Sequence, residues 1–116
     1  MRLVAKARLP LDQVEDAHIL AFRPSGGGQE SLAVIVGAPV VEGRTPVMIH
    51  RHDLGADLAE NLGPGPGPIR RGLGHLATLG GGVFLILPVE GSRSSLAAID
   101  SILRHLGISR ARWMHP

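Results

Sequence analysis

The 116-residue chain contains no cysteine. This absence excludes disulfide bonds, thiolate zinc sites, iron–sulfur clusters and a cysteine nucleophile. The chain also contains no tyrosine, and aromatic residues make up only 3% of it. We therefore expect a core of aliphatic side chains, and no aromatic platform on which nucleic-acid bases would stack.

The chain also lacks an excess of charge of one sign and a long apolar run. The chain has twelve basic and ten acidic residues, which gives a net charge of +2. A net charge this small predicts no nucleic-acid partner. The apolar run at residues 83–87 is far too short to span a bilayer, and the N-terminus has no apolar signal core. We expect one soluble, cytoplasmic domain covering residues 1–116, with no membrane partner.

Hydrophobic periodicity predicts an α/β (α+β) fold in which helices pack on one mixed sheet. The expected strands are residues 3–9, 18–22, 31–37, 45–50, 82–88 and 111–114, and the expected helices are residues 53–62, 68–80 and 94–107. Asp53 is placed to cap the first helix. The apolar stripes of the three helices are expected to include Leu54, Leu58 and Leu62; Ile69, Leu73, Leu76 and Leu79; and Leu96, Ile99, Leu103 and Leu106.

The first candidate site is the segment His-Arg-His-Asp at the end of the fourth expected strand. His50 and His52 are two residues apart, so their side chains point to the same face of the strand. With Asp53 or Asp57 nearby, they are suited to hold a metal ion or to exchange protons. The alternative is that one histidine covers a strand edge while the other is solvated.

The second candidate site is the junction between the fifth expected strand and the third expected helix. Backbone N–H groups at a helix start, with serine hydroxyls and an arginine, favour an anion. The predicted ligand-binding residues are Glu90, Gly91, Ser92, Arg93, Ser94 and Ser95. The alternative is ordinary helix capping with Arg93 in solvent.

The order of these segments resembles that of GTP cyclohydrolase II, a riboflavin-synthesis family. The resemblance runs through VAKARLP at residues 4–10, TPVMIHRHDLGADL at 45–58 and GGGVFLILPVEG at 80–91. His50 and Asp57 match the first and last residues of the family's H-S-E-C-x-T-G-D motif, and Glu90 and Gly91 match its E-G pair. The resemblance implies a GTP cyclohydrolase II-like fold and a homodimer.

The resemblance also implies that the family's zinc site is lost. Two cysteines of the family's R-C-D-C-G loop match Pro64 and Pro66, and the third zinc cysteine matches Asp53. A proline side chain has no ligand atom, so we expect no metal and no other cofactor. The family's catalytic aspartate and arginine have no counterpart here either.

Three functions remain open after zinc-dependent GTP ring opening is rejected. The first is a zinc-free protein that binds a purine nucleotide or another phosphorylated small molecule. The second is a repurposed metal-independent enzyme in which His50, His52, Asp53 or Glu90 exchange protons with another metabolite. The third is a purely structural subunit.

Overall fold

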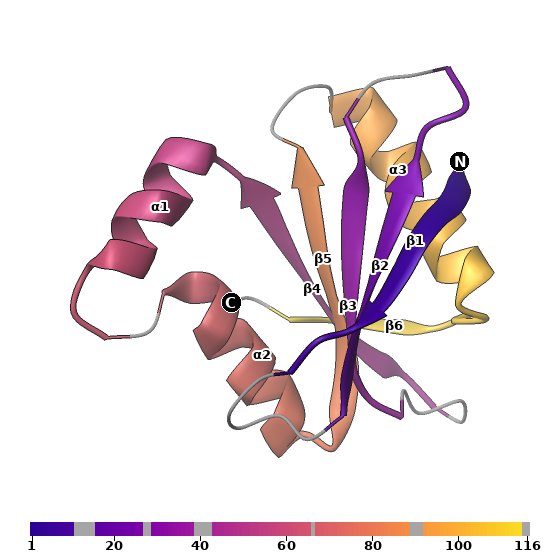
Figure 1. The fold of residues 1–116 in the computed structure, drawn as a ribbon. Coiled ribbons are helices and arrows are strands. Elements are labelled where there is room, and N and C mark those ends of the chain that lie inside the picture. The colour runs from indigo at the N-terminus through magenta and orange to yellow at the C-terminus, as the bar shows by residue number, and fades with distance from the viewer. Residues whose placement is uncertain (11–15, 27–28, 39–42, 66, 89–91, 115–116) are drawn as a thin grey trace.

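The computed structural model describes residues 1–10, 16–26, 29–38, 43–65, 67–88 and 92–114 (Figure 1). In these ranges the chain forms six strands and three helices. The strands are β1 (Arg2–Arg8), β2 (Ala17–Arg23), β3 (Ser31–Gly37), β4 (Thr45–His52), β5 (Gly81–Pro88) and β6 (Ala111–Met114). The helices are α1 (Leu54–Leu62), α2 (Pro68–Thr78) and α3 (Ser92–His105).

The six strands form one mixed sheet in the order β1-β2-β3-β5-β4-β6. Strands β1, β2, β3 and β5 pair antiparallel, whereas β4 lies parallel to both β5 and β6. Helix α2 covers one face of the sheet and α3 covers the other (Figure 1). The α+β class and the mixed sheet predicted from the sequence are therefore confirmed.

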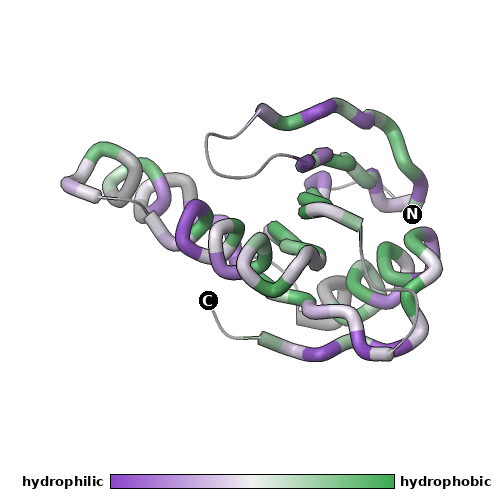
Figure 2. The backbone as a smooth tube through the Cα atoms, turned by 90° about the horizontal axis from the view of Figure 1, so that it is seen from below, coloured by the Kyte–Doolittle hydropathy of each residue, from purple (hydrophilic) through white to green (hydrophobic). Residues whose placement is uncertain are grey.

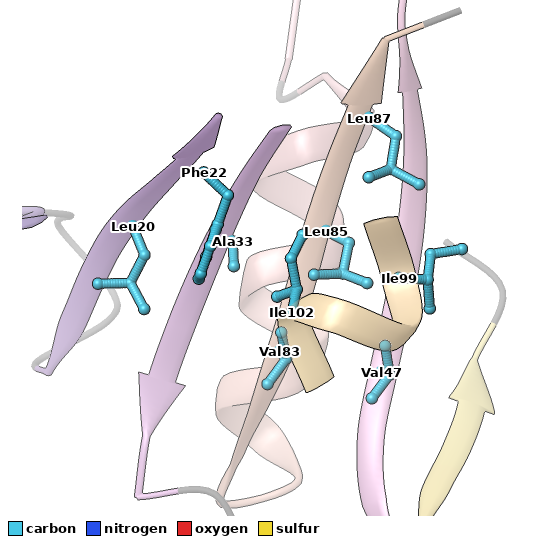
Figure 3. Close-up of a cluster of buried hydrophobic side chains, with 9 residues drawn as sticks. All are labelled: Leu20, Phe22, Ala33, Val47, Val83, Leu85, Leu87, Ile99 and Ile102. Atoms are coloured by element: carbon cyan, nitrogen blue, oxygen red, sulfur yellow. The ribbon is translucent and has the colours of Figure 1, made fainter. Parts of the chain in front are cut away.

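Strand β5 is buried on both faces, which explains why its sequence is apolar without alternation. Val83, Leu85 and Leu87 point to the cluster under α3, together with Ile99 and Ile102 of that helix (Figure 3). On the opposite face, Phe84 packs with Met48, Leu73 and Leu76 under α2. Each face of the sheet therefore has its own apolar core.

Glycine allows α2 to lie very close to the sheet. A Cβ added to Gly72 would lie 2.3 Å from Cε2 of Phe84 and 3.2 Å from the sulfur of Met48. The low helix propensity of this glycine is therefore offset by close packing of helix on strand. A Cβ added to Gly74, two residues later, would have no neighbour within 4 Å.

Each of the three predicted apolar stripes is only partly right, and in the stripe of α2 it is Leu79, just past the end of the helix, that is 38% exposed. Leu58 and Leu62 of α1 are 53% and 80% exposed, and Leu96 of α3 is 72% exposed. In α3 the side chain of Ile102 is fully buried instead. The helix starts at Ser92 rather than at Ser94. Because Ala98, Ile99 and Ile102 are its buried residues, the face of α3 that meets the sheet is rotated from the predicted stripe.

In the part of the chain that the structure describes, no helix combines the length and the apolar character that a bilayer crossing requires.

Candidate functional site

A hydrogen-bonded cluster of two histidines and one aspartate lies where β4 ends and α1 begins. His50 and His52 both belong to β4, whose strand continues two residues beyond the predicted end. Nε2 of His50 lies 2.9 Å from Oδ1 of Asp57, and Nδ1 of His52 lies 2.7 Å from Oδ2 of the same carboxyl group. The prediction that both histidines share one face of the strand is confirmed.

The start of α1 places Asp57 between the two histidines. Asp53 caps the helix as predicted, because its Oδ1 accepts a 3.1 Å hydrogen bond from the backbone N–H of Gly55. The carbonyl of Asp53 accepts the N–H of Asp57 at 2.8 Å, while the N–H of Asp53 donates to Oδ2 of Asp57 at 3.3 Å. This reciprocal pair fixes the first turn and turns the Asp57 carboxyl group back toward β4.

Asp57 is the carboxylate that both histidines contact, and Asp53 is the residue that positions it. The sequence prediction put Asp53 among the acid–base groups, and gave Asp57 as a neighbour of the histidines and as a match to the aspartate of the family motif. The signal that identifies Asp57 is its position four residues after a capping aspartate, one helical turn along, where its side chain faces back over the helix start.

The three side chains of the cluster differ in exposure. Asp57 and His50 are 10% and 13% exposed, whereas His52 is 48% exposed. The His50 ring stacks on Phe84 with a centroid distance of 6.2 Å. His50 therefore belongs to the protein interior, and His52 is the member of the cluster that meets solvent.

The pKa of the Asp57 carboxyl group is lowered from its ordinary value. Burial alone would raise this pKa, but the hydrogen bonds from His50 and His52, the electrostatic attraction of His50 and the Asp53 N–H outweigh it. An ionised carboxylate only accepts hydrogen bonds, so Nε2 of His50 and Nδ1 of His52 are the donors. In a neutral His52 ring the opposite nitrogen, Nε2, then carries the lone pair.

The described residues do not offer the ligands of the zinc site found in the family that the chain resembles. Asp53 caps a helix, and Pro64 lies exposed in the turn after α1; Pro66 lies outside the described residues. Among the residues that the structure describes, no three His, Asp or Glu side chains are arranged to hold a metal ion. The Asp57 oxygens are directed to the histidine nitrogens that would otherwise be ligands.

The second candidate site lies at the same edge of the sheet. Strands β4 and β5 are parallel neighbours, and His52 pairs in register with Pro88, the last residue of β5. Helix α3 begins at Ser92, so Ser92, Arg93, Ser94 and Ser95 form its first turn. The predicted start of this helix at residue 94 is therefore two residues too late, and Glu90 and Gly91 lie outside the described residues.

Comparison with known proteins identifies relatives of the chain. A GTP cyclohydrolase-2 of Azospirillum brasilense is 41% identical over 92 residues, which cover 78% of this chain and 24% of that relative. A GTP cyclohydrolase-2 of Xylella fastidiosa strain 9a5c is 33% identical over 97 residues, or 83% of this chain and 24% of the relative. The chain thus matches about a quarter of the length of these curated relatives. No model of a known protein family matches it.

Proposed function

The chain belongs to a GTP cyclohydrolase II-like family, and we propose that it is a zinc-free member that binds a phosphorylated small molecule. A purine nucleotide is the first ligand to test. The observation that carries the proposal is the register pair of His52 and Pro88, which brings the two candidate sites to one edge of the sheet. The carboxyl ends of parallel strands are the usual ligand-binding edge of such sheets.

The start of α3 supplies the part of this site suited to a phosphate group. Helix α3 has 14 residues, and the N–H groups of its first turn carry the positive end of the helix dipole. The sequence places Arg93 in that turn. A simple anion held by these groups alone would bind weakly, with a dissociation constant of about 1 mM.

Zinc-dependent ring opening of GTP is not part of the proposal. That reaction needs a metal-polarised water together with groups that transfer protons. The chain has no cysteine to hold zinc, and Asp53 is engaged as a helix cap. Release of formate or pyrophosphate from GTP above a buffer control, by a sample free of host enzyme, would contradict this exclusion.

The test is a ligand-induced shift in thermal unfolding with GTP, GMP, guanosine and inorganic phosphate, each measured separately. We expect the phosphorylated compounds to raise the midpoint and guanosine to have a smaller effect. Arg93→Ala should reduce the shift. Arg104→Ala is the matched control, because Arg104 lies on the same helix, forms an exposed 3.1 Å ion pair with Asp100 and is past the first turn.

The outcomes of this test distinguish three interpretations of the junction between β5 and α3. Loss of the shift in Arg93→Ala alone supports the proposal. Equal loss in both variants means that general electrostatics, rather than a site, attracts the ligand. If none of the compounds shifts the unfolding midpoint, the proposal is wrong and the junction is only the start of a helix.

A second candidate function is metal-independent acid–base catalysis, which the geometry of His52 favours. Its Nδ1 is held by a buried carboxylate while about half of the ring is exposed, an arrangement typical of a general base whose Nε2 faces a substrate. The test is consumption of nucleotides in the presence of EDTA. His52→Gln should abolish it, and His75→Gln, at an exposed histidine of α2, should not.

A further inference from the structure

Strand β6 leaves one edge of the sheet open. It is the last strand in the sheet order and, in the described part of the chain, it pairs only with β4, through residues 45–48. Figure 2 shows the segment that leads to the C-terminus along one margin of the molecule. The open edge of a strand presents N–H and C=O groups that can pair with another extended chain.

The hydrogen bonds to β4 identify the backbone groups of β6 that face outward. The N–H of Thr45 donates to the carbonyl of Arg110 at 2.9 Å, so the backbone groups of Arg110 face β4. Successive residues of a strand direct these groups to alternate sides. Those of Arg112 therefore also face β4, whereas those of Ala111 and Trp113 face the open edge. Each of these outward residues offers one N–H donor and one carbonyl acceptor.

The side chains of β6 differ in character between the two faces of the sheet. Ala111 contacts the apolar core under α3, and Met114 contacts the core under α2. Because side chains alternate along a strand, Trp113 lies on the α3 side and Arg112 on the α2 side. Trp113 is 55% exposed, and Arg112 is exposed as well. A chain added to this edge would meet an aromatic ring on one face and a guanidinium group on the other.

Arg112 belongs to a group of three arginines. Arg110 stands two residues before it, and Arg44 directly precedes Thr45, which pairs with Ala111. Neighbouring strands are about 4.8 Å apart, and residues two apart in a strand are about 6.7 Å apart, so the three backbone positions are adjacent. All three arginines are exposed, and none forms an ion pair with an acidic residue of the described ranges. Like charges gathered in this way attract an anionic partner.

The opposite edge of the sheet is protected against strand addition. Strand β1 carries Lys6 and has a bulge between Leu3 and Ala5, and both features blunt the edges of natural sheets. The pairing of β6 with β4 has no shift in register. Of the two edge strands, β6 is therefore the one suited to accept a further strand.

We propose that the open edge of β6 binds an acidic, extended segment of a partner protein as an added strand. The backbone of this segment pairs with Ala111 and Trp113, and its carboxylates meet Arg112 and the two neighbouring arginines. Its apolar side chains cover the Trp113 ring on the other face. A second copy of this chain does not suit the edge, because pairing β6 with itself would bring the arginines of both copies together.

This edge is separate from the candidate ligand sites. Strand β6 pairs with the first half of β4, whereas His52 and Pro88 are the last residues of β4 and β5. The proposal therefore goes beyond the proposed function. Failure of nucleotide binding says nothing about strand addition, and failure of strand addition says nothing about nucleotide binding.

The fluorescence of Trp113 reports on this edge directly, because the chain has one tryptophan and no tyrosine. The experiment titrates the full chain with a peptide of about eight alternating glutamate and valine residues, at concentrations up to about 1 mM. We expect a saturable shift of the emission to shorter wavelength, which added salt weakens. A peptide with lysine in place of glutamate, and an acidic peptide with methylated backbone nitrogens, should give no shift.

Three variants test the groups that make the contact. Arg112→Glu should weaken binding of the acidic peptide by at least about tenfold. Lys6→Glu is the matched control, because it makes the same change of charge on the opposite edge strand, and it should change the affinity by less than about twofold. Ala111→Pro removes an outward N–H group and keeps the pairing with β4, so it should weaken binding while the unfolding midpoint shows that the fold is retained.

Several results would overturn the proposal. Absence of a shift at every peptide concentration would mean that the edge accepts no acidic strand. Equal losses in Arg112→Glu and Lys6→Glu would mean that general electrostatics attracts the peptide, and unchanged binding of the methylated peptide would mean that no strand is added. Tighter binding of a single-stranded oligonucleotide would assign the arginines to nucleic acid. Emission that changes with protein concentration alone would mean that a second copy covers the edge.

Discussion

Oδ2 of Asp57 accepts a 2.7 Å hydrogen bond from Nδ1 of His52, and this bond joins α1 to the end of β4. The same carboxyl group contacts His50 through its other oxygen. Leu58 and Leu62 of α1 face solvent, so among the described side chains of this helix the contact with the sheet is made by a polar cluster rather than by apolar packing. Changes to Asp57 should therefore affect both the stability of the protein and the geometry of the candidate site.

Asp57→Asn should lower the free energy of unfolding by about 1–3 kcal/mol, because a buried hydrogen bond to a charged group is replaced by weaker neutral contacts. The measurement is urea-induced unfolding followed by circular dichroism. Asp100→Asn is the control, since Asp100 forms only an exposed ion pair with Arg104, and its removal should change the free energy by less than about 0.5 kcal/mol. Equal effects of the two changes would contradict a structural role for the cluster.

The contribution of Asp57 to stability should be lost at acidic pH. Its pKa in the folded protein lies below the ordinary value of 3.8, so the folded state binds this proton less readily than the unfolded state does. The stabilisation is therefore complete above the ordinary pKa and declines as the pH falls through the lowered value. The difference in unfolding free energy between the wild type and Asp57→Asn should accordingly be smaller at a pH below 3.8 than at neutral pH. If this difference in unfolding free energy does not change with pH, the pKa of Asp57 is not lowered in the folded protein.

The strands were predictable because each has a simple pattern. The segment 31–37 is apolar between turn residues, and its predicted and observed limits coincide. The order of the strands was not predictable in the same way. The position of β5 between β3 and β4 depends on contacts such as Val34 with Phe84 and Ile49 with Leu85, which local periodicity does not contain.

The side of α1 that faces the sheet could not be predicted from the spacing of its leucines. Leu58 and Leu62 have the periodicity of a buried stripe, yet Asp57 determines which side of the helix meets the sheet. The paired histidines were predictable, because residues two apart in a strand share a face. The residue that joins them was not, because its role depends on the helix start that Asp53 creates.

Gly72 and Gly74, two residues apart in α2, should respond in opposite ways to replacement by alanine. In Gly72→Ala the new Cβ meets the Phe84 ring, so overpacking should destabilise the protein by about 1–3 kcal/mol. In Gly74→Ala nothing lies within 4 Å of the new Cβ, and the higher helix propensity of alanine should stabilise it by about 0.5–1 kcal/mol. Thermal unfolding midpoints check both signs. If both changes stabilise the protein, α2 does not lie as close to β5 as the structure indicates.

The last prediction concerns zinc. The purified chain should contain well under one zinc ion per molecule, even after growth in zinc-supplemented medium. The physical reason is that a thiolate site is impossible without cysteine, while His50 and His52 direct ring nitrogens to Asp57 rather than to a shared centre. Elemental analysis of the native protein, before and after dialysis against EDTA, measures the content.

A zinc content near one per chain that survives dialysis would contradict the prediction, and two variants would then locate the ion. His52→Ala removes the exposed member of the cluster, and His75→Ala removes an exposed histidine of α2. Loss of zinc in His52→Ala alone would mean that the cluster rearranges around a metal and that Asp57 becomes a ligand. Loss in neither variant would place the ion elsewhere in the chain. The metal-free result, in contrast, leaves the His52–Asp57 pair to act through proton exchange or hydrogen bonding alone.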